Sequence, residues 1–200
     1  MKTGGHMNSK TKKMAGTALL AAVIVVLQTV ASGIRIGPFT PTFALIPIVV
    51  GALLYGEWAG AFLGLVFGLV VVVAVLSGAE GMSTMMLEAH PFWTVFVCLL
   101  KGAAAGFVPG LVYKMFKNKD SFWATAIPAV LAPISNTGIF TVFLLTVFMP
   151  IAREVAAAVG YEKVGGFVMT MIIGWNFLVE IGINIVLIPI IARVIKAVRS

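Results

Sequence analysis

Six apolar runs occupy most of this chain, and most of them are long enough to cross a lipid bilayer as helices. A spanning helix needs about 20 predominantly apolar residues. The run at residues 42–55 is short and contains Pro47, so that helix is expected to be tilted, broken or extended by the segment before it. The sequence therefore predicts an all-α membrane protein, a single bundle of about six transmembrane helices. The runs lie within residues 14–32, 42–55, 58–76, 92–113, 122–149 and 166–195.

Composition supports lipid as the solvent. Hydrophobic residues make up 60% of the chain and charged residues 10%, whereas an ordinary soluble domain has about 45–50% and about 25%. The net charge of +7 would suggest nucleic acid binding in a soluble protein. Here the basic residues form short clusters between apolar runs, which argues against a nucleic acid partner and favours a membrane topology signal.

The basic clusters predict the orientation of the helices. Cytoplasmic segments of membrane proteins carry an excess of Lys and Arg. With the N-terminus inside, the only basic residues of the outside segments are Arg35, Arg153 and Lys163, and acidic residues accompany them. An even number of helices then places both termini in the cytoplasm. The inside segments hold Lys10, Lys12, Lys13, Lys114, Lys117, Lys119, Arg193, Lys196 and Arg199.

Two parts of unequal size are expected. Residues 1–6 resemble a cloning remnant, with Met7 as the natural start. The rest of residues 1–13 is a basic segment on the cytoplasmic side. Residues 14–200 form the six-helix membrane domain. The first apolar run lacks a small-x-small cleavage site followed by a soluble domain, so we do not expect a cleaved signal peptide.

Small residues recur every four positions in three of the runs. In lipid, helices associate by close backbone approach at such residues. Ala18 and Ala22 share this spacing in the first run. The stripes therefore predict helix contacts, within the bundle or with a partner protein, and for the glycines we favour contacts within the bundle. The glycine stripes are Gly56, Gly60, Gly64 and Gly68, and Gly102, Gly106 and Gly110.

Polar residues inside the apolar runs are the main candidates for function. Asn176, Glu180 and Asn184 are spaced to share one helix face, Lys101 lies near the middle of the fourth run, and Asn136 follows a proline in the fifth. Such groups are costly in a bilayer and usually face a partner or a cavity. Lys101 and Glu180 could form a structural ion pair with the asparagines as interhelical contacts. They could instead line a cavity for a small polar solute, which we favour, and both could be partly true.

Four further candidates lie near the predicted outer ends of the helices or, for Trp175, beside Asn176 as a possible cavity wall. They are His90, Trp93, Trp175 and Arg35. Each has an ordinary alternative: Trp93 could be an interfacial anchor, Trp175 a membrane belt residue, and His90 a solvated loop residue. No second natural histidine accompanies His90 to bind a metal.

Recognisable catalytic motifs are missing from the sequence. There is no nucleophilic serine with an evident base, no His-Glu-x-x-His and no phosphate-binding glycine loop, and Asp120 is the only aspartate. The single Cys98 excludes an internal disulfide. We therefore expect no enzyme, no cofactor and no metal. A homo-oligomeric channel or small-solute permease working without ATPase partners stays as an alternative, with the glycine stripes as its interface and Lys101 and Glu180 as pore charges.

The order of these motifs resembles the S component, the substrate-binding membrane subunit, of energy-coupling factor (ECF) transporters. The resemblance lies in Ala18-Leu-Leu-Ala-Ala22, in residues 46–51 and 55–64 at the junction of the second and third helices, and in residues 100–106. It is nearest the vitamin-binding branch of that family and covers nearly the whole chain after Met14.

The resemblance implies a function and partners. The chain would capture a water-soluble vitamin, such as riboflavin, pantothenate or a folate-like molecule, from outside a prokaryotic plasma membrane. Delivery inward would require a transmembrane coupling subunit and two ATPase subunits, with Ala18 and Ala22 docking on the coupling subunit. The substrate would lie in the outer half of the bundle against the last three helices. Lys101 would favour an anionic substrate such as pantothenate, provided that Glu180 does not neutralise it.

Overall fold

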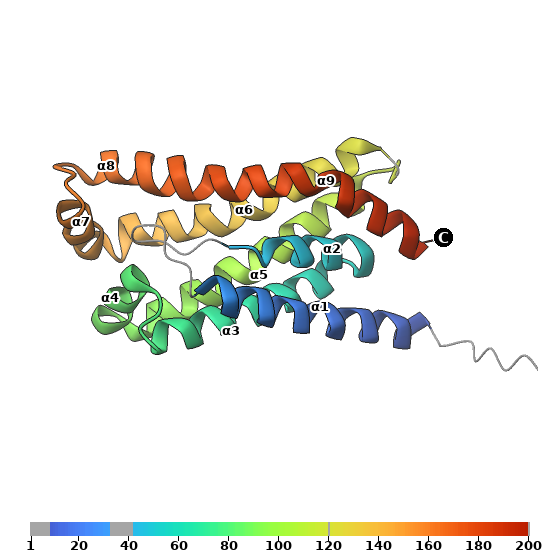
Figure 1. Ribbon diagram of the computed structural model, residues 1–200, viewed down its shortest axis with the longest axis horizontal. Helices are drawn as coiled ribbons and strands as arrows, with labels where there is room; N and C mark the ends of the chain where they lie inside the picture. The colour runs from blue at the N-terminus through green and yellow to red at the C-terminus, as the bar shows by residue number, and fades with distance from the viewer. Residues whose placement is uncertain (1–8, 33–41, 120, 200) are drawn as a thin grey trace, which may run out of the picture.

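A computed structural model describes residues 9–32, 42–119 and 121–199 of the chain. The helices lie along one long axis and form a single bundle (Figure 1), and no strand occurs in these ranges. The elements in chain order are α1 (Ser9–Ser32), α2 (Leu45–Tyr55), α3 (Glu57–Leu76), α4 (Gly81–Ala89), α5 (Pro91–Met115), α6 (Phe122–Thr146), α7 (Met149–Ala158), α8 (Val164–Phe167), the π-helix η1 (Val168–Phe177) and α9 (Leu178–Arg199).

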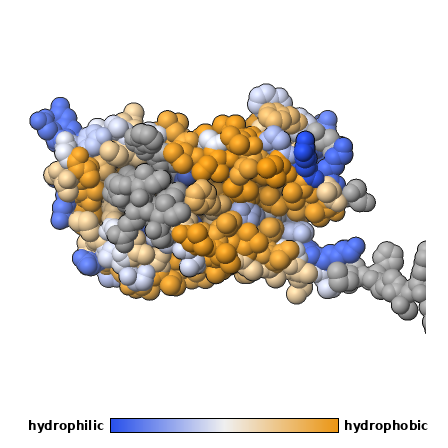
Figure 2. All heavy atoms as spheres, viewed as in Figure 1, coloured by the Kyte–Doolittle hydropathy of each residue, from blue (hydrophilic) through white to orange (hydrophobic). Residues whose placement is uncertain are grey.

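Five helical segments of the described chain are long and apolar enough to cross a membrane: Lys10–Ser32, Glu57–Leu76, Pro91–Met115, Phe122–Thr146 and Val164–Val198. The remaining predicted run, at residues 42–55, forms α2, which has only 11 residues. A broad apolar belt covers the middle of the face shown in Figure 2, and hydrophilic residues gather toward its two ends. The prediction of an all-α membrane bundle is confirmed, with the second helix short as expected.

Two polar stretches that were predicted only as connections contain short helices instead. α4 lies within residues 77–90 and α7 follows α6, and both pack at the same end of the bundle (Figure 1). α4 buries Met82 and Met86, whereas α7 buries Ala152, Val155 and Ala156. Amphipathic helices of this length cover the end of the core without crossing the membrane. The predicted segment at residues 33–41 lies outside the described residues.

The core of the bundle is a seam between α3 and α5, which carry the two glycine stripes. Gly60 and Gly64 of α3 lie against the backbone of Gly106 and Gly102 of α5. One turn further along α3, a Cβ built on Gly68 would be 2.7 Å from the carbonyl oxygen of Cys98. The predicted internal packing is confirmed for Gly60, Gly64, Gly68, Gly102 and Gly106, because only the missing side chains allow this approach. Gly110 packs against Glu57, whereas Gly56 lies between α2 and α3 with a positive φ and packs against no other helix.

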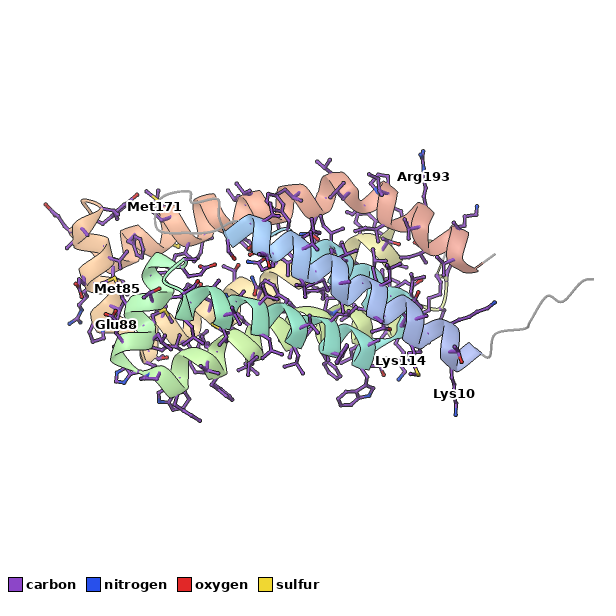
Figure 3. The ribbon with its side chains drawn as sticks, turned by 60° about the horizontal axis from the view of Figure 1, so that its bottom comes forward. Lys10, Met85, Glu88, Lys114, Met171 and Arg193 are labelled. Carbon is purple, nitrogen blue, oxygen red and sulfur yellow. The ribbon has the colours of Figure 1, made fainter. Side chains whose placement is uncertain are left out.

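The two ends of the bundle differ in charge. Lys10, Lys114 and Arg193 lie at the end where α1 begins and α9 finishes, whereas Glu88 lies at the opposite end (Figure 3). The predicted inside segments therefore meet at one end of the molecule. That this end faces the cytoplasm stays a prediction from the charge pattern.

An ion pair connects α3 and α5 at the basic end. Lys114 Nζ is 2.7 Å from Glu57 Oε1, and the side chains are 67% and 16% exposed. Exposed pairs contribute little to stability, so replacing Lys114 with methionine should leave the free energy of unfolding almost unchanged. The melting temperature in detergent should fall by no more than about 4 °C. Lys117→Met, which removes an exposed lysine just after α5, is the control. A much larger loss for Lys114→Met alone would show that the pair holds the seam together.

Candidate binding site

A cluster of buried polar side chains joins α6 to α9 in the interior of the bundle. Asn136, Thr137, Glu180 and Asn184 are 4%, 5%, 1% and 1% exposed. The Thr137 hydroxyl donates a hydrogen bond to Glu180 Oε2 at 3.0 Å, and Asn184 Nδ2 donates to the backbone oxygen of Glu180 at 2.9 Å. Glu180 is therefore the centre of the cluster, held by one contact from each helix.

The sequence around these residues explains their placement. Pro133 lies inside α6, where its missing N–H removes a hydrogen bond to the preceding turn. Asn136 and Thr137 follow within the next turn and turn inward. On α9, Glu180 and Asn184 are four residues apart and share one face. The predicted common face thus holds for these two residues.

Three acceptor atoms of the cluster accept no hydrogen bond of normal geometry from any described residue. They are Asn136 Oδ1, Glu180 Oε1 and Asn184 Oδ1. Thr42, just before α2, and Asn136 lie near enough to the Glu180 carboxyl group to interact with it, but only the Thr137 hydroxyl makes a hydrogen bond of normal geometry. A buried acceptor without a donor costs about 1–3 kcal/mol, so such atoms mark a place where a ligand's donors can bind.

Lys101 lies close to the cluster without joining it. It is half-buried on α5, and its Nζ is 5.1 Å from the centroid of the Phe140 ring on α6. Within the described residues the only ion pair shorter than 4.0 Å is Lys114–Glu57. The direct Lys101–Glu180 ion pair considered from the sequence is therefore not formed.

The small-residue stripe of α1 lies on the outside of the bundle. Ala18 and Ala22 are exposed, whereas Ile24 on the opposite face is fully buried. Gly16 lies directly against the Tyr55 ring of α2. The alanines are therefore free of internal packing and open to another molecule.

Comparison with known proteins identifies the family. The family model "ECF transporter, substrate-specific component" matches residues 12–192. The chain belongs to this family. It is therefore a multi-pass protein of the prokaryotic plasma membrane and the substrate-specific part of a transporter, and not an enzyme.

A curated relative extends the comparison along nearly the whole chain. The S component is 26% identical over 204 residues to the pantothenic acid transporter PanT of Lactococcus lactis subsp. cremoris (strain MG1363). The match covers 96% of this chain and 97% of the relative. No solved structure matches significantly.

The remaining predicted site residues of the S component lie apart from the cluster or cannot be placed. Trp93 is 41% exposed and packs with Phe96 and Phe143, two turns before Lys101 on α5. His90 is exposed between α4 and α5, with its ring centroid 6.0 Å from that of Phe148. The structure brings neither to Glu180.

The backbone of Trp175 and Asn176 lies in η1, but their side chains, like all of Arg35, fall outside the described residues. That Asn176 shares a face with Glu180 and Asn184 stays a prediction, because the Asn176 side chain lies outside the described residues.

Two polar residues of this region were not predicted from the sequence. Thr137 had a signal, because it adjoins Asn136 after an intramembrane proline. Thr42 had none, since a threonine at the start of a short run is ordinary. The prediction relied on charged and amide groups and did not include the Thr137 hydroxyl, which contacts Glu180.

A small pocket borders the cluster on the side of η1. It has a volume of about 220 Å³ and lies between α6 and η1. Thr137 contributes both to this pocket and to the hydrogen bond with Glu180. Apart from the Thr137 and Thr141 side chains the lining is apolar, and a Cβ built on Gly138 at its wall would meet no other part of the protein within 4 Å. Its lining residues are Ile134, Thr137, Gly138, Thr141, Ile173 and Phe177.

Proposed function

We propose that this S component captures pantothenate from outside the cell and delivers it inward with an ATP-driven coupling module. Support comes from the family and from the relative named for pantothenic acid, which aligns over almost all of both chains. Riboflavin and folate-like vitamins are the other substrates that the sequence resemblance allowed.

The observation that carries the proposal is the pairing of buried acceptors with one half-buried ammonium. Pantothenate combines a carboxylate with two hydroxyls and an amide N–H, and it has no aromatic ring. Asn136, Glu180 and Asn184 offer acceptors for its donors, and Lys101 offers a cation for its carboxylate. Buried sites recognise polar ligands by such complementary hydrogen bonds.

Other residues complete the proposal. Asn176 and Trp175 on η1 would contact the substrate, with Trp93, His90 and Arg35 nearer the outer end. Ala18 and Ala22 would dock on the transmembrane coupling subunit, and two ATPase subunits would hydrolyse ATP. The homo-oligomeric channel alternative used the glycine stripes as its interface, but the seam between α3 and α5 occupies them.

Mass spectrometry of small molecules released from the detergent-purified protein tests the substrate first. Slow dissociation retains tight ligands through purification, so pantothenate should be recovered near one molecule per protein. Pantothenate at about 100 times its Kd should also stabilise the fold by about 2.7 kcal/mol, raising the melting temperature by about 5–10 °C. Stabilisation by riboflavin or folate, with no effect of pantothenate, would overturn the substrate assignment.

A further inference from the structure

We infer that the site binds its substrate in one orientation, with the carboxylate at Lys101 and the hydroxyl end at Glu180 and Asn184. This inference rests on the proposed function and adds to it which end of the substrate each group recognises. Glu180 and Asn184 then select a hydroxylated ligand, while Lys101 selects a carboxylated one.

The Glu180 end is suited to a ligand that donates hydrogen bonds. Asn184 uses its Nδ2 on the backbone oxygen of Glu180, which leaves Oδ1 as a buried acceptor without a donor from the described residues. Glu180 Oε2 already accepts a hydrogen bond from Thr137, whereas Oε1 accepts none from the described residues. A ligand carboxylate has no proton to donate to these oxygens. Hydroxyl and amide N–H groups satisfy them.

The Lys101 end is suited to an anion. The Phe140 ring lies 5.1 Å from the ammonium and holds it by a cation–π contact, which leaves the N–H donors for a ligand. No described carboxylate lies within 4.0 Å of it. A ligand carboxylate there forms charge-assisted hydrogen bonds, which are about twice as strong as neutral ones.

The two ends are displaced along the bundle axis. Phe140 lies one helical turn beyond Asn136 on α6, which is about 5.4 Å along the axis. α6 runs from the basic end of the bundle toward the end covered by α4 and α7 (Figure 1). The carboxylate therefore lies nearer the α4 and α7 end, and the hydroxyls lie deeper in the bundle.

The inference is tested by comparing two ligands that differ only at the carboxylate. Pantothenol carries a primary alcohol in place of the carboxylate of pantothenate. Affinities for both ligands are measured by isothermal titration calorimetry on the full chain in detergent. The parent should prefer pantothenate by at least about tenfold, as expected for a charge-assisted hydrogen bond.

Variants at the two ends should act differently on that preference. Lys101→Met should reduce the preference for pantothenate over pantothenol to about onefold. The affinity for pantothenol should stay within about threefold of the parent's, because the neutral ligand makes no charge-assisted contact. Glu180→Gln and Thr137→Val should weaken both ligands together and keep the preference. Lys117→Met and Glu162→Gln remove exposed charges elsewhere and should change neither affinity.

Phe140 is a positioning residue. Its role is measured by the same ratio of the affinities for pantothenate and pantothenol. Phe140→Leu should lower the preference, and Phe140→Tyr should restore it, because only an aromatic face holds the ammonium. If Lys101→Met is not monodisperse, Lys101→Gln removes the same charge with a polar side chain.

The proposed orientation of the substrate is overturned if the lysine variants keep the parent's preference for pantothenate over pantothenol. It is also overturned if Glu180→Gln loses that preference. A parent that binds neither ligand overturns the proposed function itself.

Discussion

Alanine in place of Gly64 should destabilise the bundle by about 3 kcal/mol or more. The added Cβ would fall on the backbone carbonyl oxygen of Gly102. A backbone atom cannot rotate away as a side chain does, so α3 and α5 must separate along the seam. The melting temperature of the purified protein should fall by about 6–12 °C, and circular dichroism during heating measures it.

Gly182 provides a matched control on α9. No atom lies within 4 Å of a Cβ built there, so Gly182→Ala adds the same methyl group to a membrane helix without a contact. Alanine is also the better helix former by about 1 kcal/mol, so this variant should be as stable as the parent or more so. Equal melting temperatures for Gly64→Ala and the parent would show that the seam is not closely packed in the membrane protein.

Tryptophan at both Ala18 and Ala22 should abolish coupled uptake while leaving substrate affinity almost unchanged. Both alanines are exposed on α1, so the indole rings project away from the bundle and block the close approach of a partner helix. Affinity in detergent should change by less than about threefold, because distant sites act independently. Uptake of labelled pantothenate by cells that carry the coupling module measures transport, and calorimetry measures binding.

Tryptophans on another exposed face provide the control. Val186 and Ile190 on α9 are 73% and 56% exposed and have the same spacing of four. Val186→Trp with Ile190→Trp should transport like the parent, since α9 does not contact α1. If the Ala18 and Ala22 variant lost binding together with transport, the stripe would be part of the fold and not a docking surface.

Hydropathy located the bundle well because each spanning helix needs a long apolar run. The apolar run predicted at residues 58–76 became α3, Glu57–Leu76, with its start moved by one residue. α4 and α7 were missed because 9 and 10 residues are too few to register as spanning runs. The glycine stripes predicted close packing, but not that α3 and α5 are the partners, because nothing in either stripe specifies the other helix.

The site was predictable only in part. Glu180 and Asn184 were found because charged and amide groups in apolar runs are costly. Their contact with Thr137 depends on how α6 and α9 cross, which no local pattern encodes. The separation of Lys101 from Glu180 was likewise hidden, because the Phe140 ring that holds the ammonium looks in sequence like any lipid-facing phenylalanine.

The seam between α3 and α5 also has a consequence for how the protein is made. Chains emerge from the ribosome N-terminus first, and early parts assemble before later ones exist. Only α4 and its short flanks separate α3 from α5, so the two glycine faces can close on each other as a hairpin soon after α5 leaves the ribosome. α6 and α9 then enter the bilayer beside an assembled pair, and Asn136 and Glu180 meet protein there instead of hydrocarbon. On this order the candidate site residues on α6 and α9 are the last to take their places, and a nascent chain arrested after α5 still lacks Asn136, Glu180 and Asn184.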